Sequence, residues 1–179
     1  IQIDTISVVE RAHHHVLSTR VPSYSPDMLH ELQAKQKTVF EYWYHAAAYL
    51  PMEDYRFYRP TMEGLKKKKP VDKKLRKNIL QRIKTEGPLS SKDFEAPKGQ
   101  NNSGWWDWKP AKRAMEMMFL SGELMIAERK GFQKVYDLTE NCLPSSINIA
   151  QPSDETRGYF YIRKMLANLG VARAKDICY

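Results

Sequence analysis

The sequence is poor in cysteine. Only Cys142 and Cys178 occur among its 179 residues, in unrelated contexts and without a C-x-x-C spacing. A structural zinc site or a disulfide framework needs clustered cysteines, so neither is expected. We interpret both residues as reduced thiols of a cytoplasmic protein.

Long hydrophobic runs are also absent. No apolar stretch approaches the roughly 20 residues that a transmembrane helix needs. No N-terminal stretch has the charged and then apolar pattern of a secretion signal. With 42% hydrophobic and 28% charged residues, the composition is typical of a globular protein of one domain or two small ones. We therefore expect no contact with a membrane.

Acidic residues are too few to balance the basic ones. The formal net charge is +8, which favours a polyanionic partner such as nucleic acid. Between residues 64 and 84, ten lysines and arginines accompany one acid, Asp72. This block is either a solvated linker or a segment that binds along the phosphates of a nucleic acid. In the second case its affinity would fall steeply with salt. It includes the consecutive residues Lys66, Lys67, Lys68 and Lys69.

Residues 72–143 have the element order of a winged helix. The pattern predicts a helix over residues 72–86, a short helix after Ser90, a third helix over residues 109–120, and two strands joined by a turn at Lys130 and Gly131. The third helix of such a module usually enters the major groove. Its candidate DNA-binding side chains are Lys109, Lys112 and Arg113. Before this unit we expect helices over residues 8–21, 26–37 and 52–67 and a strand over residues 38–44.

Part of this unit recurs near the end of the chain. Residues 79–94 align with residues 162–177 at a constant offset of 83, which places Gly87 on Gly170 and Asp93 on Asp176. The simplest interpretation is a further winged-helix unit that starts near Asp154.

Aromatic residues and histidines form two local clusters. Trp105, Trp106 and Trp108 precede the third helix and form either a core cluster or a stacking surface for DNA. The run from His13 to His15 lies in a predicted helix, where consecutive side chains point about 100° apart, so it is not expected to hold a metal. His45, near Glu41, is a better site candidate, and its alternative is a buried histidine with a satisfied hydrogen bond.

The first residues alternate between apolar and polar. In an extended strand, Gln2 and Asp4 share one face and Ile1 and Ile3 the other. Such a face can form the floor of a cleft, and its ordinary alternative is a half-exposed strand with two solvated side chains.

Three stretches together resemble the YcaQ/AlkZ-type bacterial DNA glycosylases. They are QIDTISVVERAHHHVLSTRV, VFEYWYHAAAYLP followed by EDYRFYR, and GWWDWKPAKRAMEMMFLSGELMIAER. The resemblance implies tandem winged helices and a catalytic glutamine–x–aspartate motif at the bottom of a DNA-binding channel, here Gln2 and Asp4. It implies hydrolysis of the N-glycosidic bond of N-alkylated purines and, in some members, unhooking of interstrand crosslinks. Full-length members extend beyond both ends of this chain, so we expect a piece truncated at both ends.

The resulting prediction is an α+β, mainly helical protein with tandem winged-helix units and small β-hairpins. Residues 1–70 would form an incomplete first winged-helix region with the catalytic motif, residues 71–150 a second winged helix, and residues 151–179 the start of a third. Asp4 would activate water and Gln2 would orient it, with Glu41 and His45 as possible site support.

Double-stranded DNA with alkylated or crosslinked purines is the expected partner, in the bacterial cytoplasm and nucleoid. No cofactor, metal or obligate protein partner is expected. The alternatives are a non-catalytic winged-helix DNA-binding protein or transcription regulator, and a structural or protein-interaction scaffold.

Overall fold

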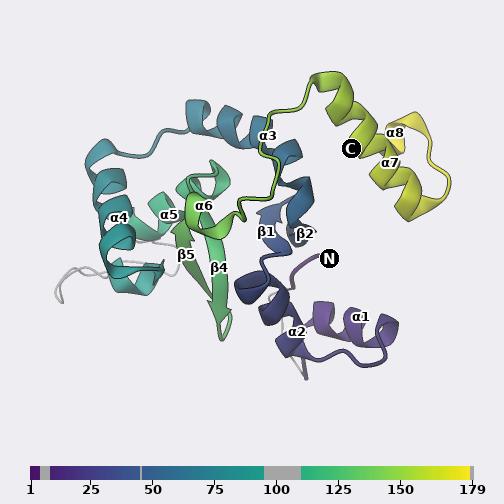
Figure 1. Ribbon diagram of the computed structural model, residues 1–179, viewed down its shortest axis with the longest axis horizontal. Coiled ribbons are helices and arrows are strands. Elements are labelled where there is room, and N and C mark those ends of the chain that lie inside the picture. The colour runs from purple at the N-terminus through teal and green to yellow at the C-terminus, as the bar shows by residue number, and fades with distance from the viewer. Residues whose placement is uncertain (5–8, 45, 95–109, 178–179) are drawn as a thin grey trace, which may run out of the picture.

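Helices make up most of the fold, with two small antiparallel sheets between them (Figure 1). The computed structural model describes residues 1–4, 9–44, 46–94 and 110–177. These ranges confirm the predicted α+β, mainly helical class. The helical elements are α1 (Ala12–Arg20), α2 (Pro26–His30), the π-helical turn η1 (Glu31–Lys35), the 3-10 turn η2 (Met52–Asp54), α3 (Tyr55–Lys68), α4 (Lys73–Glu86), the 3-10 turn η3 (Ser91–Phe94), α5 (Pro110–Leu120), α6 (Thr139–Cys142), α7 (Asp154–Leu169) and α8 (Ala174–Ile177).

The first sheet pairs β1 (Val39–Trp43) with β2 (Ala47–Pro51), from Val39 opposite Pro51 to Trp43 opposite Ala47. The predicted strand over residues 38–44 is confirmed. The sequence pattern did not indicate β2, because its two alanines have little intrinsic preference for a strand. Pairing with β1 therefore decides the conformation of this segment.

The second sheet has the strand order β3 (Leu89–Ser90), β5 (Gln133–Leu138), β4 (Leu124–Lys130). Along the chain, α4, β3, η3 and α5 precede the β4–β5 hairpin, which is the predicted order. The predicted turn is displaced by one residue, because β4 includes Lys130 and the turn consists of Gly131 and Phe132. A left-handed φ of 62° at Gly131 permits this tight connection.

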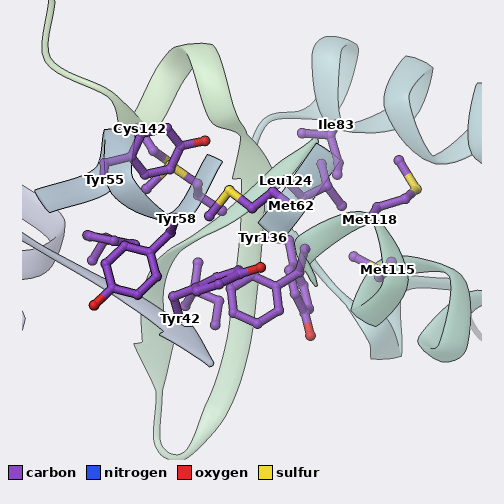
Figure 2. Packing of buried hydrophobic residues seen from close by; sticks show 14 of the residues in the cluster. Tyr42, Tyr55, Tyr58, Met62, Ile83, Met115, Met118, Leu124, Tyr136 and Cys142 are labelled. Carbon is purple, nitrogen blue, oxygen red and sulfur yellow. The ribbon is translucent and has the colours of Figure 1, made fainter. Parts of the chain in front are cut away.

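One hydrophobic core joins the first sheet, α3, α4, α5 and the hairpin. Figure 2 shows tyrosines from β1 and α3 beside methionines from α3 and α5. Phe40, Ile79, Ile83, Met115, Met118 and Leu124 are almost completely buried there. The core extends across position 70, so residues 1–70 and 71–150 pack together, and their assignment to separate winged-helix units stays a prediction.

The repeated segments have a similar local structure, although η3 is a 3-10 turn and α8 is α-helical. η3 spans residues 91–94 and α8 spans residues 174–177, which are equivalent positions at the offset of 83. α4 ends at Gly87 with φ 88°, and α7 ends at Gly170 with φ 73°. The predicted repeat is confirmed at this level, and its extension to a further winged helix stays a prediction.

The helix α7 packs near the start of α3, whereas α4 follows the end of α3 (Figure 1). The rings of Phe57 and Phe160 stack with centroids 3.9 Å apart, and the Lys164 ammonium lies 2.7 Å from the buried carboxylate of Asp54.

Among the described helices, none combines the length and the apolar character needed to cross a membrane.

Candidate active site

The first residues of the chain form an edge strand on β2. The main-chain nitrogen of Ile1 donates to the Tyr49 carbonyl at 2.9 Å, and the Tyr49 N–H donates to the Ile1 carbonyl at 2.8 Å. The Ile3 N–H donates to the Ala47 carbonyl at 2.8 Å, and Gln2 lies opposite Ala48. The expected extended conformation of this segment is therefore confirmed.

Burial alternates along this edge strand. Ile3 is buried in a small cluster with Leu29 and Tyr49, whereas Gln2 is exposed and Asp4 is half-buried. Because side chains of an extended strand alternate between faces, Gln2 and Asp4 lie on the face opposite to Ile3. The amide and the carboxylate thus share a face that is exposed at Gln2 and half-buried at Asp4.

The same face continues across the sheet to tyrosine side chains. Gln2 pairs with Ala48, which pairs with Tyr42, and directly opposed residues share a face. Tyr42 and Tyr44 both contact the ring of Tyr58, at centroid distances of 5.7 and 6.4 Å. Tyr44 is 44% exposed, and its hydroxyl lies 4.0 Å from the sulfur of Met165 in α7. Ala48 and Tyr42 are themselves buried, so this face is accessible at the edge strand and closed toward the core.

His13 contacts the main chain of Asp4. The Asp4 N–H donates to Nδ1 of His13 at 3.2 Å, and His13 is buried in α1. The next histidine, His14, has its Nδ1 2.5 Å from the hydroxyl of Tyr24. In the described ranges, no group of three or more His, Cys, Asp or Glu side chains is arranged to hold a metal ion.

Glu41 lies on the other face of the sheet. It is opposite Tyr49, which is opposite Ile1, and it is buried. Arg129 of β4 donates hydrogen bonds to both carboxylate oxygens, from Nε at 2.6 Å and from Nη2 at 2.7 Å. Glu41 thus joins the first sheet to the hairpin, and any support that it gives to Gln2 and Asp4 acts through the sheet. His45 lies outside the described residues.

The tip of the β4–β5 hairpin docks on α1. The ring of Phe132 lies between two guanidinium groups, with the Arg11 carbon 3.6 Å and the Arg129 carbon 4.3 Å from its centroid. Phe132 also packs against the cluster that contains Ile3. Sequence reasoning missed Arg129 and Phe132, because Glu41 and Arg129 are 88 positions apart and leave no local pattern.

One cavity lies at this junction, and a larger one lies farther along the hairpin. One of 170 Å³ is lined by residues that include Arg11, His13, Tyr49 and Arg129, and one of 420 Å³ lies among η1, β1 and the hairpin. Neither cavity is lined by Gln2 or Asp4. The candidate site accordingly lies outside both cavities, at the edge of the first sheet.

The basic candidates are exposed and lie away from Gln2 and Asp4. Lys66, Lys67, Lys68 and Lys69 are at the end of α3, whose 14 residues span about 21 Å at 1.5 Å per residue. Lys66 is 3.7 Å from the Glu123 carboxylate, which Arg76 also contacts. Lys112 and Arg113 are exposed on α5. Lys109 and the tryptophans Trp105, Trp106 and Trp108 lie outside the described residues.

Comparison with protein families identifies one match over the whole chain. The family described as DNA glycosylase AlkZ-like matches residues 1–179. No solved structure matches the chain. The family match covers the Gln2–Asp4 face, the shared core and the repeated segment alike.

Proposed function

The chain belongs to the DNA glycosylase AlkZ-like family, and we propose that it hydrolyses the N-glycosidic bond of N-alkylated purines in double-stranded DNA. Membership of this family supports the activity of a DNA-repair hydrolase. The substrate class and the roles of individual residues are our proposal.

The observation that supports this proposal most directly is that Gln2 and Asp4 share a face at the accessible edge of the first sheet. The face is held by the hydrogen bonds of Ile1 and Ile3 to β2, so the amide and the carboxylate project from a fixed backbone. A carboxylate and an amide on one face can hold and activate a single water molecule.

The chemistry requires no other reactive group. An N7-alkylated purine in DNA carries a positive charge, so it leaves as a neutral base when the bond from its N9 to the sugar C1′ breaks. The developing oxocarbenium charge on the sugar is stabilised by the Asp4 carboxylate. Gln2 orients a water whose oxygen bonds to C1′, and Asp4 accepts the proton that this water loses. The reaction needs no lysine nucleophile and is therefore monofunctional.

The openness of the site favours bulky substrates. Gln2 is exposed, and the face lies on an edge strand. A base that is crosslinked to the opposite strand cannot be turned into a closed pocket. We infer that this face approaches the lesion within the duplex, which extends the proposed substrates to interstrand crosslinks.

The rest of the fold supplies surfaces for the DNA backbone. The order α4, β3, η3, α5, β4, β5 and the strand order β3-β5-β4 support a winged helix. In this proposal Lys112 and Arg113 of α5 and the lysines Lys66–Lys69 contact phosphates. The Phe132 tip of the hairpin packs on α1. The hairpin therefore also fixes the distance between the unit from α4 to β5 and the edge strand.

Release of free base tests the proposal. The full-length protein and its Asp4→Ala and Asp4→Asn variants are incubated with duplex DNA that contains N7-methylguanine, and the released base is measured by mass spectrometry. We expect both variants to lose at least about 100-fold in rate, since they remove the base and the charge that stabilises the sugar. The affinity for DNA should stay within about twofold, because one carboxylate near the sugar contributes little to phosphate binding.

Glu53→Gln is the matched control, since Glu53 is an exposed acid in η2. It should leave the rate unchanged. Equal rates in wild type and Asp4→Ala refute the role of Asp4. Salt-sensitive DNA binding without any base release instead identifies a non-catalytic DNA-binding protein or regulator.

A further inference from the structure

The three consecutive histidines of α1 have three different environments. His13 is buried, with 4% of its surface exposed, and its ring lies 6.3 Å from that of Tyr49. His14 is half-buried beside the Tyr24 hydroxyl, and His15 is exposed. His13 contacts the segment that carries Gln2 and Asp4.

The direction of this contact fixes the form of the His13 ring. A main-chain N–H can only donate, so Nδ1 of His13 accepts the hydrogen bond from Asp4 and carries no proton. The ring is therefore neutral, with its proton on Nε2. Burial, together with the nearby His14 and Arg11, lowers the pKa of His13 to about 4, so the ring keeps this form at neutral pH.

The Asp4 N–H lies just beyond the ladder that holds the edge strand. The last hydrogen bond of Ile3 to β2 runs from its N–H to Ala47, one residue before Asp4. Nδ1 of His13 in α1 thus holds the backbone of Asp4. The backbones of Ile1 and Ile3 are held by β2. The carboxylate direction follows from this backbone, since only two side-chain torsions separate them.

We propose that His13 is a positioning residue, whose neutral imidazole holds the main chain of Asp4 so that its carboxylate faces the reacting water and sugar. This inference rests on the proposed function of Asp4. It assigns to the histidine run a role that neither metal binding nor surface solvation provides.

The variants His13→Asn and His13→Leu separate positioning from packing. The amide oxygen of asparagine takes nearly the same place as Nδ1 and can accept the Asp4 N–H, whereas leucine fills the space without an acceptor. We expect His13→Leu to lower kcat for release of N7-methylguanine about 10- to 100-fold, as losses of orienting contacts do. Its Kd for the same DNA should stay within about twofold. His13→Asn should retain kcat within about threefold, and the exposed control His15→Ala should match wild type.

Hydrogen exchange of the Asp4 amide gives a measure that does not depend on activity. The amide should be protected in wild type and His13→Asn, and should exchange faster in His13→Leu. If His13→Leu fails to fold, His13→Gln replaces it, because its acceptor lies one carbon farther along the side chain. His13→Gln should then show the faster exchange and the lower kcat.

Several results would overturn the inference. One is a wild-type kcat and unchanged Asp4 exchange in His13→Leu. Another is an equal loss of kcat in His13→Asn and His13→Leu when both fold, which would show that only the imidazole's packing matters. A wild-type protein that releases no base overturns the proposed function and this inference together, whereas an active wild type with an equally active His13→Leu overturns the inference alone.

Discussion

The segments that begin with α4 and α7 have matching sequences and matching local structure but opposite burial. Ile79 and Ile83 of α4 are 0% and 1% exposed, whereas Ile162 and Leu166 at the same repeat positions are 39% and 40% exposed. Both helices end at a glycine with positive φ and lead into a four-residue helical turn. Among the described residues, α4 therefore has apolar partners over this face that α7 does not have.

The partners of α4 come from elsewhere in the chain. Ile79 and Ile83 belong to the core that includes Met115 and Met118 of α5 and Leu124 of β4. The helix α7 instead uses Phe160 and Lys164 to contact the start of α3. A repeat in sequence thus predicts a helix and its end, and it does not predict which face is covered.

Truncation of the equivalent apolar side chains should give the largest difference. Ile83→Ala leaves a cavity in a closed core and should destabilise the protein by about 3 kcal/mol. Leu166→Ala removes a side chain that is already partly hydrated and should cost less than about 1 kcal/mol. Urea unfolding measures both free energies. Similar losses would show that α7 is buried as deeply as α4 in solution.

Substitution of the two helix-ending glycines should have a smaller effect. Gly87 and Gly170 have φ values of 88° and 73°, where a Cβ is unfavourable. Gly87→Ala and Gly170→Ala should each cost about 1 kcal/mol in the free energy of unfolding. Gly64→Ala, in the middle of α3 with open space around its Cβ position, is the control and should be neutral or stabilising. Unequal losses at Gly87 and Gly170 would mean that the two helix ends differ in solution.

The smallest effect should come from the aspartates that cap the short turns. The Ser90 hydroxyl and N–H donate to Asp93 at 2.7 Å, and the Arg173 N–H donates to Asp176 at 2.9 Å. Hydrogen bonds from the Ser90 and Arg173 side chains and main chains hold the pKa of Asp93 and of Asp176 below the usual value. A lowered pKa in the folded state means that this stabilisation is present above the unfolded pKa and disappears as the pH falls through the folded pKa.

Asp93→Ala and Asp176→Ala should therefore speed hydrogen exchange of the amides of Ser90 and Arg173, respectively, at neutral pH and change it little in acid. Amide exchange followed by NMR checks this. If only one of the two amides loses protection, the structural repeat includes the helices and does not include the turns that follow them.

The elements that the sequence predicted share strong local signals. Asp72 caps α4 by accepting the N–H of Leu75 at 2.9 Å, and glycine ends the helix. Alternation of Gln2, Ile3 and Asp4 predicted their two faces. The segment Ala47–Pro51 has no such signal and becomes β2 only through β1 and the residues before Asp4.

Long-range partners explain what the sequence could not predict about the candidate site. Glu41 looked like a site residue because His45 is near it in the sequence, yet its carboxylate pairs with Arg129 on the opposite face from Gln2. The contact of His13, rather than of its neighbours in the histidine run, with Asp4 could likewise not be predicted from the sequence. Only the path of residues 1–4 brings the Asp4 N–H to its ring.

The sequence by itself determined where α4 and α7 begin and end, which residues of the edge strand point together, and which segments repeat. Caps, positive-φ glycines and alternation act over a few neighbouring residues. Tertiary structure alone decided which apolar faces are buried, that Arg129 neutralises Glu41, and that a histidine holds Asp4. These outcomes depend on residues far apart in the sequence whose meeting is selected by the packing of the whole core.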